Sequence, residues 1–513
     1  MIATVYTDVP SSFKEAINSP DSKEWIKAIK EELRNLYDNK IMTFVKNIPA
    51  GTNVITTKWI FSIKRDSNGN IIRFKARLVA RGFDQIHGID FILTYSPTLN
   101  IDSLKFIIAI ASKMLWDIYQ LDIKAAYLNA PLDTDIYTTI PLGDSNFGGG
   151  YWKLNKALYG LKQSGRQWNK TIDKFLRRNN FKPLKSEPCI YVYRENNKAR
   201  CIIGLYVDDM VIAGEKSATS NIILQIKKEF KISNYGPINY ILGIKIQKSN
   251  FTYTISQAHY IKNLLQKFNM LNSRSKNTPC TITDKSNVNE TPFDKTKYKS
   301  AIGALIYLAK CTRPDISFAV NKAARKSENP TISDWNTVVN ILKYLSTTID
   351  YKISYDGKGE IVGYTDADYG GSEDYKSTSG GIILMGNSPI CWQSKKQNCV
   401  ATSTAEAEYI SASMNTKKLL WIRNMTFEIL KTSKPMTLYL DNNACKRIIE
   451  NGEINTRLKH INIHYHFLID NLRKNKIKFE RASSKEMLAD ALTKDLLGTK
   501  MSEFTNKIFI KNI

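Results

Sequence analysis

Short apolar runs alternate with turns and basic stretches along most of the chain, which predicts a protein of mixed helices and strands. Two of these runs, 201–207 and 210–213, have the length of buried strands and flank the aspartates Asp208 and Asp209. The pattern therefore predicts a hairpin with both carboxylates at its tip. A solvated Asp-Asp turn is the alternative, but the apolar walls and the preceding Tyr206-Val207 argue against it.

Two adjacent carboxylates resist ionisation beside each other unless a cation compensates them. Carboxylate oxygens are ligands that suit Mg²⁺, and two such ions about 3.5–4 Å apart hold both oxygens of an in-line phosphoryl displacement. A third carboxylate, Asp122, is embedded in another apolar strand, where an uncompensated charge is costly. We therefore predict a metal site formed by Asp122, Asp208 and Asp209.

The stretch 56–83 alternates apolar and basic residues around Asn68-Gly69, which is a strong hairpin signal. A solvated basic ribbon is one interpretation; contact with a triphosphate or a template backbone, which relieves the repulsion between the cations, is the other. Seven cations lie on or beside the two strands: Lys58, Lys64, Arg65, Arg73, Lys75, Arg77 and Arg81. An amphipathic helix at 22–39 precedes this hairpin and has the pattern of a packing helix.

A glycine-rich basic turn opens the amphipathic helix within 151–181, and backbone amides at such a helix start suit phosphates. The turn contains Gly160, Lys162, Gln163, Gly165 and Arg166. We expect Gly160 and Lys162 to contact the nucleotide. Beyond the aspartate hairpin, the pattern predicts a helix at 217–230, a strand or hairpin at 238–246 and a helical thumb at 255–271.

The stretch 272–296 is polar and rich in Ser, Thr, Asn and Lys, so we expect a linker, followed by connecting helices. A different pattern starts near Lys358. It predicts a strand at 359–371, a hairpin at 379–397, a helix at 404–430, a strand and helix at 436–452, and a last strand and helix at 476–494. Four acids lie at strand ends or on helices in this part, and we expect it to have a core of its own. They are Asp366, Glu408, Asp441 and Asp490.

The size and charge of the chain narrow its functional class. Its 513 residues suffice for about three or four domains, and no run reaches the roughly 18 uncharged apolar residues of a membrane span. A basic n-region with an apolar stretch is missing at the start, and the seven cysteines contain no C-x-x-C, so we expect a reduced, intracellular protein. The formal charge of +26 favours a nucleic-acid partner over a membrane surface.

Several motifs together resemble the reverse transcriptase and RNase H portion of copia-type retrotransposon Pol polyproteins. These motifs are KWIFSIKRDSNGNIIRFKARLVARGF, QLDIKAAYLNAPL, KALYGLKQSGRQW, YVDDM, YILGIKI, RPDISFAV, YTDADYGG, STSGG, WQSKKQ, TAEAEY, LKHINIHYHF and ADALTK. The resemblance implies an α+β multidomain chain with a right-hand polymerase of fingers, palm and thumb, a connecting region and an RNase H-like α/β domain. We expect reverse transcriptase at 1–271, linker and helical connection at 272–357, the RNase H-like domain at 358–496 and a C-terminal tail at 497–513.

The resemblance also implies roles for individual residues. Tyr127 lies beneath the incoming sugar, Leu242-Gly243 forms a primer grip, and Lys64, Lys75 and Arg77 contact triphosphate or template. The resemblance implies two active sites, each with two Mg²⁺ ions, or Mn²⁺. The ligands of the first site are Asp122, Asp208 and Asp209, and those of the second are Asp366, Glu408, Asp441 and Asp490. The expected partners are an RNA template, a DNA primer, RNA–DNA hybrid and dNTPs, in the cytoplasm within a virus-like particle or in the nucleus.

Two departures from the family pattern are evident. No histidine lies at 482–485 before the last aspartate, and His460, His464 and His466 belong to an upstream helix. The helix also begins with Ala405, where copia relatives commonly have a serine- or threonine-rich lead into the glutamate. The choice of Glu408 over Glu406 as the helical ligand therefore rests on its place directly before Tyr409.

Other readings stay open. Motifs of an aspartic protease, an integrase zinc module and a nucleocapsid knuckle are not found, so we expect a portion of a polyprotein. A non-catalytic, nucleic-acid-binding remnant and an RNA-copying polymerase of viral or telomeric type are the alternative functions.

Overall fold

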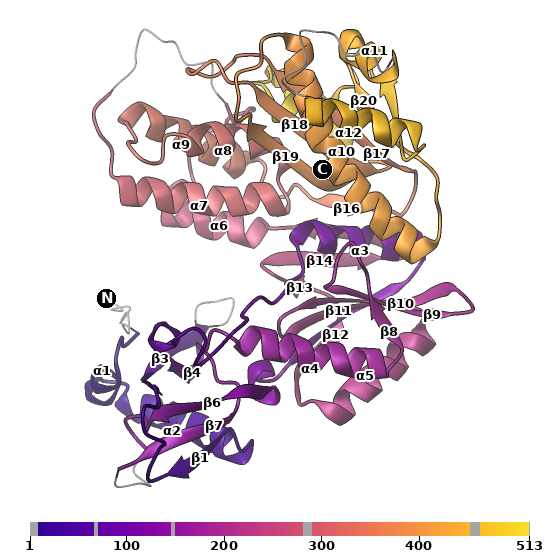
Figure 1. Ribbon diagram of the computed structural model, residues 1–513. Helices are drawn as coiled ribbons and strands as arrows, with labels where there is room; N and C mark the ends of the chain where they lie inside the picture. Colours follow the sequence, from indigo (N-terminus) through magenta and orange to yellow (C-terminus); the bar gives the residue numbers. More distant parts are fainter. Residues whose placement is uncertain (1–8, 66–69, 145–148, 281–289, 452–461, 512–513) are drawn as a thin grey trace.

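The computed structural model describes residues 9–65, 70–144, 149–280, 290–451 and 462–511, without the side chains of 65 and 462–465. It has two lobes (Figure 1). The lower lobe in that view holds the N-terminal part of the chain, and the upper lobe holds the connecting helices and the C-terminal domain. None of the described helices has both the length and the apolarity that crossing a membrane requires. The predicted α+β multidomain architecture is confirmed.

The first subdomain is built on the predicted amphipathic helix. Helix α2 (Ser22–Asp38) buries Trp25, Ile29, Leu33 and Leu36 against two small sheets. One sheet has the order β1-β7-β6-β2 and the other is the pair β3-β4. The elements are α1 (Phe13–Asn18), β1 (Met42–Val45), β2 (Val54–Ile55), β3 (Thr57–Arg65), β4 (Ile71–Ala80), η1 (Gly82–Asp84), β6 (Pro131–Thr139) and β7 (Tyr151–Lys156).

Strands β3 and β4 form the predicted basic hairpin, with Ser62 opposite Lys75 and Ile60 opposite Arg77. Its predicted turn, Asn68-Gly69, lies outside the described residues. Because side chains alternate along a strand, Arg73, Lys75 and Arg77 share one face of β4. The opposite face, with Ala76 and Leu78, packs into the core beneath α2. The hairpin therefore presents its cations away from that core.

The second subdomain is a six-stranded sheet of order β12-β5-β11-β10-β9-β8. Alternate apolar residues along its central strands point to opposite faces of the sheet. One set packs toward α3, and the other packs toward α4 and α5. The elements are α3 (Ile101–Lys113), β5 (Asp117–Ile123), η2 (Ala126–Asn129), α4 (Ser164–Arg178), β8 (Phe181–Pro183), β9 (Ile190–Glu195), β10 (Lys198–Tyr206), β11 (Asp209–Gly214), α5 (Lys216–Glu229) and β12 (Ile232–Pro237). This sheet is the predicted palm.

A small sheet and a helical bundle follow the palm. The sheet has the order β13-β14-β15-β16, and four helices share one apolar core. These elements are β13 (Tyr240–Ile241), β14 (Ile244–Ser249), β15 (Thr252–Ser256), α6 (Ala258–Lys267), α7 (Lys295–Cys311), η4 (Pro314–Ile316), α8 (Ser317–Ala324), α9 (Ile332–Thr347) and β16 (Ile353–Tyr355). The boundary expected at 271 divides this bundle, because α6 packs on α9 and shares its core.

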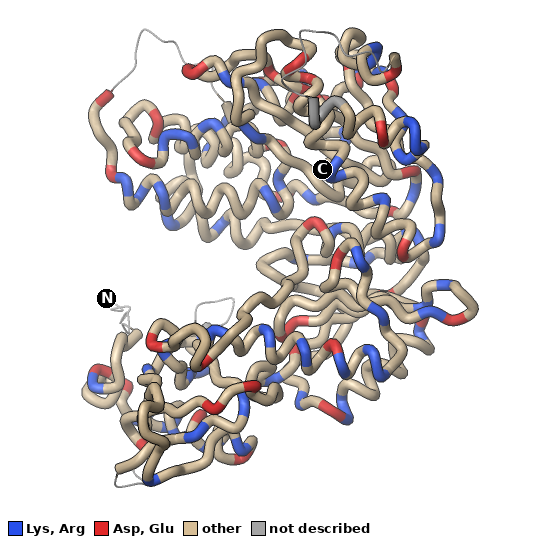
Figure 2. Tube along the Cα trace, in the orientation of Figure 1, with Lys and Arg blue, Asp and Glu red and all other residues tan. Residues whose placement is uncertain are grey.

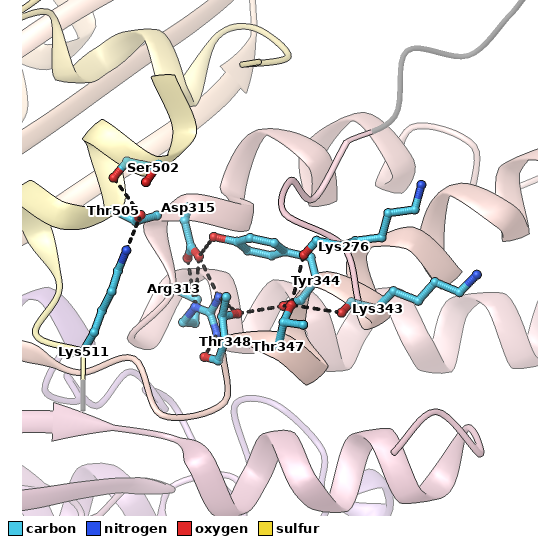
Figure 3. Close-up of polar contacts among 10 residues, drawn as sticks. All are labelled: Lys276, Arg313, Asp315, Lys343, Tyr344, Thr347, Thr348, Ser502, Thr505 and Lys511. Atoms are coloured by element: carbon cyan, nitrogen blue, oxygen red, sulfur yellow. Dashed lines mark hydrogen bonds and ion pairs between the residues drawn. The ribbon is translucent and has the colours of Figure 1, made fainter. Parts of the chain in front are cut away.

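A buried ion pair fixes the end of this bundle (Figure 3). The guanidinium of Arg313 donates to both oxygens of Asp315 and to the carbonyl and hydroxyl of Thr348. The hydroxyl of Tyr344 donates to Asp315 at 2.7 Å. Arg313 and Asp315 have 1% side-chain exposure or less, so their charges are compensated by each other and by these hydrogen bonds.

The C-terminal domain has a five-stranded sheet of order β19-β18-β17-β20-β21. The first three strands are antiparallel, and β20 and β21 run parallel to β17. This is the RNase H-like α/β sheet that was expected. Its elements are β17 (Ile361–Asp368), β18 (Thr378–Met385), β19 (Ser388–Lys396), α10 (Thr404–Leu430), β20 (Met436–Leu440), α11 (Asn443–Asn451), α12 (Asn462–Arg473), β21 (Ile477–Arg481), η6 (Leu488–Leu492) and α13 (Gly498–Ile508).

Two expectations for this domain are wrong. The segment 497–513 is not only a tail, because α13 buries Met501, Phe504 and Ile508, which are spaced as on one helix face. The core of the domain is also not separate from that of the palm: apolar residues of palm helix α3 and of β18, β19 and α10 form one continuous cluster. The separation of the two domains along the chain suggested independent cores. Helix α3, however, has apolar side chains on nearly all sides, so it has to be covered by more than the palm sheet.

Polar contacts reinforce the junction between palm and C-terminal domain. The ammonium of Lys105 on α3 is buried, 3.0 Å from Asp102 and 3.3 Å from the centre of the Trp392 ring on β19. The indole of Trp392 donates to the carbonyl of Ala309 on α7. Palm, bundle and C-terminal domain thus meet around one buried cation.

Candidate active sites

The predicted aspartate hairpin is present at the centre of the palm. Strands β10 and β11 are antiparallel, with Tyr206 opposite Asp209, so Val207 and Asp208 form a two-residue turn. Val207 has a φ of 52°, which is unfavourable for a β-branched residue and is found where surrounding contacts fix the backbone. One such contact is the indole of Trp168 on α4, which donates to the Val207 carbonyl at 2.7 Å.

The third predicted carboxylate lies beside this turn. Strand β11 pairs with β5 so that Asp209 is directly opposite Asp122, which puts their Cβ atoms about 4.5–5.5 Å apart on the same face. The amide of Ile123 donates to the carbonyl of Asp208 at 3.0 Å. The carboxylate of Asp122 accepts a hydrogen bond from Ser233 on β12. The structure thus brings all three predicted residues together at one end of two inner strands of the sheet.

The electrostatics of this palm site are those of crowded acids. Burial raises the pKa of Asp209 to about 6, with further contributions from the charges of Asp208 and Asp122. The pKa of Asp208 is also raised, first by burial and then by Asp122, while Arg77 and Lys75 oppose the shift. Half-buried carboxylates in this arrangement favour a divalent cation, whose hard oxygen ligands they would supply.

Two predicted cations of the fingers hairpin reach the palm aspartates electrostatically. Lys75 is half-buried, and its pKa is lowered by burial and by the neighbouring charges of Arg77 and Lys64. Lys75 and Arg77 line a pocket of about 370 Å³ between α2 and β4, together with Tyr159. The buried carboxylate of Glu32 on α2 lies on the same side and is an electrostatic partner of Lys75. The structure therefore places Lys75 and Arg77 where their charges act on Asp208. Lys64 is an electrostatic neighbour of Lys75.

Tyr127 lies within this environment. It belongs to the turn η2 after β5, and burial and the charge of Asp208 raise the pKa of its phenol. Its ring is 5.7 Å from that of Tyr159, and Arg77 lies over the Tyr159 ring at 5.4 Å. Our sequence interpretation missed Tyr159, whose pKa burial raises to about 12. Its position directly before Gly160 in the segment singled out for phosphate contacts was the available signal.

Gly160 and Lys162 have contacts within the protein. A Cβ at Gly160 would lie 2.1 Å from the carbonyl oxygen of Ala80, so a glycine is needed where this loop crosses the end of β4. The ammonium of Lys162 lies 3.3 Å from the Gln85 carbonyl and 4.7 Å from the centre of the Phe91 ring. Their contact with a nucleotide stays a prediction.

Leu242 and Gly243 form the two-residue turn between β13 and β14. Both have positive φ, 47° and 70°, as a type I′ hairpin turn requires. The hydroxyl of Tyr307 on α7 donates to the Leu242 carbonyl, and a Cβ on Gly243 would lie 2.4 Å from that hydroxyl. The turn is thus fixed to the helical bundle; its role as a primer grip stays a prediction.

A second acidic cluster lies in the C-terminal domain. Asp366 at the end of β17, Asp441 after β20 and Asp490 in η6 each place one carboxylate oxygen within 4.8 Å of the others. In the described part of the chain, this is the only group of three or more acidic, histidine or cysteine side chains that gathers so closely. The oxygens suit Mg²⁺ or Mn²⁺.

The fourth predicted acid, Glu408, faces this cluster from α10. It is 6% exposed, and burial together with the charges of Asp366 and Asp441 raises its pKa to about 9. Its Oε2 atom is buried without a hydrogen-bond partner. A buried, unsatisfied carboxylate oxygen beside three others fits a divalent cation as the missing partner. Glu406, by contrast, accepts hydrogen bonds from the backbone and hydroxyl of Thr402 at the start of the helix.

Sequence interpretation missed two neighbours of this acidic cluster. The hydroxyl of Thr493 donates to Asp366, and Lys494 lies 3.0 Å from Asp490 and 3.4 Å from Asp366. A lysine four residues after an acid in a helical pattern was the available signal. Of the upstream histidines, His460 lies outside the described residues, and no side chain is described for His464.

Comparisons with known proteins agree with the polymerase-like fold of the N-terminal part of the chain. Residues 39–282 match the family model described as reverse transcriptase (RNA-dependent DNA polymerase). The chain is similar to the Pol polyprotein from transposon TNT 1-94 of Nicotiana tabacum, with 35% identity over 94% of this chain and 38% of that protein. The Pol polyprotein from transposon RE1 of Arabidopsis thaliana is 32% identical, over 98% of this chain and 35% of that protein.

A shorter relative and a solved structure extend these matches. An uncharacterized mitochondrial protein of Arabidopsis thaliana is 32% identical over 42% of this chain and 92% of its own length. A foamy viral protease-reverse transcriptase, solved in complex with double-stranded DNA, has a TM-score of 0.50 with 10% sequence identity, over 89% of this chain and 69% of that one. At this identity the structural likeness shows the fold alone.

Fold and palm site define a reverse transcriptase-like protein. Residues 39–282 belong to the reverse transcriptase family. The chain as a whole is similar to retrotransposon Pol polyproteins, and it spans just over a third of the length of the two named above. The predicted resemblance is confirmed.

Proposed function

We propose that this chain is an RNA-directed DNA polymerase. The observation that carries the proposal is the register that sets Asp122 opposite Asp209 beside the Asp208 turn, in a region that matches the reverse transcriptase family. Two divalent cations bound there would supply charge stabilisation for attack of a primer 3′-oxygen on the α-phosphate of a dNTP. The crowded aspartates are the residues that would hold them.

The other residues of the site have roles that follow from their positions. Lys75 and Arg77, at the pocket near Asp208, suit the negative charge of a triphosphate. Tyr127 offers a ring beside Asp208 that would pack against the sugar and exclude a 2′-hydroxyl by bulk. The Trp168 hydrogen bond keeps the turn, and therefore Asp208, in one position.

The test is extension of a DNA primer on an RNA template by the purified 513-residue chain with Mg²⁺ and dNTPs. Asp208→Asn should reduce extension by about a thousandfold or more, because metal stabilisation of the transition state is worth several kcal/mol. Wild-type extension that persists in Asp208→Asn would contradict the assignment. Absence of extension in the wild-type chain, with protein that still binds RNA, would favour the non-catalytic remnant.

We propose hydrolysis of the RNA strand of an RNA–DNA hybrid as the second function. Support comes from the close gathering of Asp366, Asp441 and Asp490 with the unpartnered oxygen of Glu408. Cations held there would activate water and stabilise the leaving 3′-oxygen. Cleavage of labelled RNA in a hybrid, lost in Asp441→Asn, is the measurement; cleavage that survives this change would refute the site.

We infer that template, primer and hybrid are the partners of both sites. The charge of +26 supports this, and Figure 2 shows Lys and Arg spread over both lobes rather than confined to one. Helices α6 and α7 lie at the edge of the upper lobe nearest the lower one (Figure 1). The exposed lysines of these two helices include Lys262, Lys267, Lys295, Lys297 and Lys299. Binding should weaken with salt, as phosphate contacts do.

A further inference from the structure

Lys494 occupies an unusual place for a lysine, because it contacts the acids expected to hold metal. Its Nζ lies 3.0 Å from Oδ1 of Asp490 and 3.4 Å from Oδ2 of Asp366. The same Asp366 oxygen accepts the hydroxyl hydrogen bond of Thr493. These are two of the three carboxylates whose oxygens lie within 4.8 Å of one another. The ammonium of Lys494 therefore contacts two of the carboxylates that would bind the metal.

A lysine and a divalent cation cannot use these oxygens independently. Both carry positive charge, and two cations about 4 Å apart repel strongly even at the effective dielectric of a protein surface. Binding of a divalent cation to Asp366 and Asp490 must therefore push the ammonium away or be weakened by it. The lysine acts on the affinity of the site through the carboxylates that it contacts.

Lys494 has the freedom that such an exchange requires. Its side chain is 43% exposed, and a lysine stem has four flexible carbons that can carry the charge to solvent. Lys105, another lysine in contact with a buried aspartate, is 1% exposed and is enclosed by Asp102 and Trp392. Only the first of these two lysines can leave its carboxylates without uncovering the core.

We propose that Lys494 is an exchangeable counter-ion of the acidic cluster. In protein stripped of divalent cations it keeps Asp366 and Asp490 together against their mutual repulsion, and it gives way when a divalent cation binds. Lys494 thereby sets the metal concentration at which this site is filled. This inference rests on the proposed hybrid-cleaving site, and it makes Lys494 a positioning residue.

The test is calorimetric titration of Mn²⁺ into the full chain carrying Asp208→Asn, which weakens the palm site equally in every sample. The binding component that disappears in Asp441→Asn identifies the C-terminal site. Lys494→Met should tighten that component by about tenfold, because the competing charge is removed. Lys494→Arg should stay close to wild type. Lys322→Met is the matched control, since it removes a surface partner of Asp495 outside the cluster, at 2.9 Å.

A purely structural role predicts the opposite sign, because a disordered acidic cluster binds Mn²⁺ more weakly. Unchanged or weaker binding in Lys494→Met, or a titration without any component lost in Asp441→Asn, overturns the proposal. Should Lys494→Met fail to fold, the pair of Asp490→Asn and Asp490→Asn/Lys494→Met replaces it. In the Asp490→Asn background the repulsion between Asp366 and residue 490 is relieved, so adding Lys494→Met should lower the free energy of unfolding only slightly. A large additional loss of stability in the double variant also overturns the proposal.

Hybrid cleavage by the wild-type chain separates this inference from the proposed function. Cleavage together with unchanged Mn²⁺ affinity in Lys494→Met removes the counter-ion role alone. A tighter Mn²⁺ site in a chain that cleaves no hybrid supports the counter-ion role and refutes the nuclease.

Discussion

The two acidic clusters of this chain are built in different ways. The palm cluster comes from neighbouring strands: Asp122 and Asp209 are paired residues of one sheet, and Asp208 is the adjacent turn. The C-terminal cluster collects acids from a strand end, a long helix, a loop and a 3-10 helix. One carboxylate oxygen each of Asp366, Asp441 and Asp490 lies within 4.8 Å of the other two, a closeness that the palm acids do not reach.

The two clusters thus show two ways of holding like charges together: strand register in the palm and tertiary packing in the C-terminal domain. Register fixes the palm carboxylates through the backbone while leaving them half-buried. The C-terminal acids are closer and more deeply covered, and the partly exposed ammonium of Lys494 offsets part of their charge. We therefore expect the palm acids to respond mainly to substrate and metal, and the C-terminal acids also to anything that disturbs the core around them.

The largest expected effect is a double dissociation of the two activities. Asp441→Asn should leave extension of a short primer on RNA largely intact, and Asp208→Asn should leave hybrid cleavage largely intact, while each abolishes its own reaction. Both assays need one fixed ionic strength and saturating hybrid, because the basic protein's binding depends on salt. Loss of both activities in each single variant, with folding retained, would mean that the comparison describes one composite site.

The pH dependence of stability should distinguish the two clusters next most strongly. The folded state keeps the Glu408 proton up to about pH 9, whereas an unfolded glutamate releases it near 4.5. Between these values the folded state binds more protons, so this residue makes stability fall as pH rises. For Asp209 the corresponding window runs from about 3.8 to about 6.

Thermal unfolding in EDTA from pH 4 to pH 9 measures these windows. Glu408→Gln should remove the part of the decline that extends above pH 6, whereas Asp209→Asn should flatten only the part below it. Saturating Mg²⁺ should flatten the decline in the wild-type chain, because a cation compensates the carboxylates. A Tm profile that Glu408→Gln leaves unchanged would show that this glutamate is not crowded.

A smaller effect is expected at Tyr127, which has no counterpart in the C-terminal cluster. Tyr127→Ala should raise incorporation of ribonucleotides relative to deoxyribonucleotides by about tenfold or more, because the bulk near the sugar is removed. Tyr127→Phe is the control that keeps the ring. Single-nucleotide insertion kinetics give the ratio, and an unchanged ratio would make Tyr127 a core residue only.

The smallest effect should come from the hydrogen bond that fixes the palm turn. Trp168→Phe keeps an aromatic ring but removes the donor to Val207, which should cost about 1 kcal/mol of stability and slow extension a few-fold. Trp152→Phe is matched to it, because that indole N–H is buried without a hydrogen-bond partner and its removal should not be costly. Equal denaturant midpoints and extension rates for the two variants would count against a role of the Trp168 bond.

The palm was easier to predict from sequence than the C-terminal cluster's surroundings. Asp208 and Asp209 are adjacent charges between two apolar runs, and Asp122 lies within a third run. The hairpin and the strand could therefore be predicted from the local pattern. The helix at 404–430 was predicted with the observed bounds because its start and end are marked locally. Local signals of this kind act within a few residues.

Contacts between distant segments could not be read in this way. The chain pattern shows that α3 is apolar, but not that β19 covers it, and it shows Lys494 four residues after Asp490, but not that Asp366 is its second partner. Tyr159 was missed for the same reason, because its place in the site depends on contacts with Tyr127 and Arg77, which are distant in sequence. Tertiary packing decides such pairs, and no single segment records them.

The buried ammonium of Lys105 has a consequence for the time course of synthesis. Helix α3 leaves the ribosome about 275 residues before β19 supplies Trp392, a delay of roughly 15–55 s at typical translation rates of about 5–20 residues per second. During that interval the apolar face of α3 is uncovered, and Lys105 stays hydrated because its aromatic partner has not been made. A nascent chain of this protein is therefore expected to depend on chaperones until the last domain is complete, and release at residue 357 should give an aggregation-prone palm.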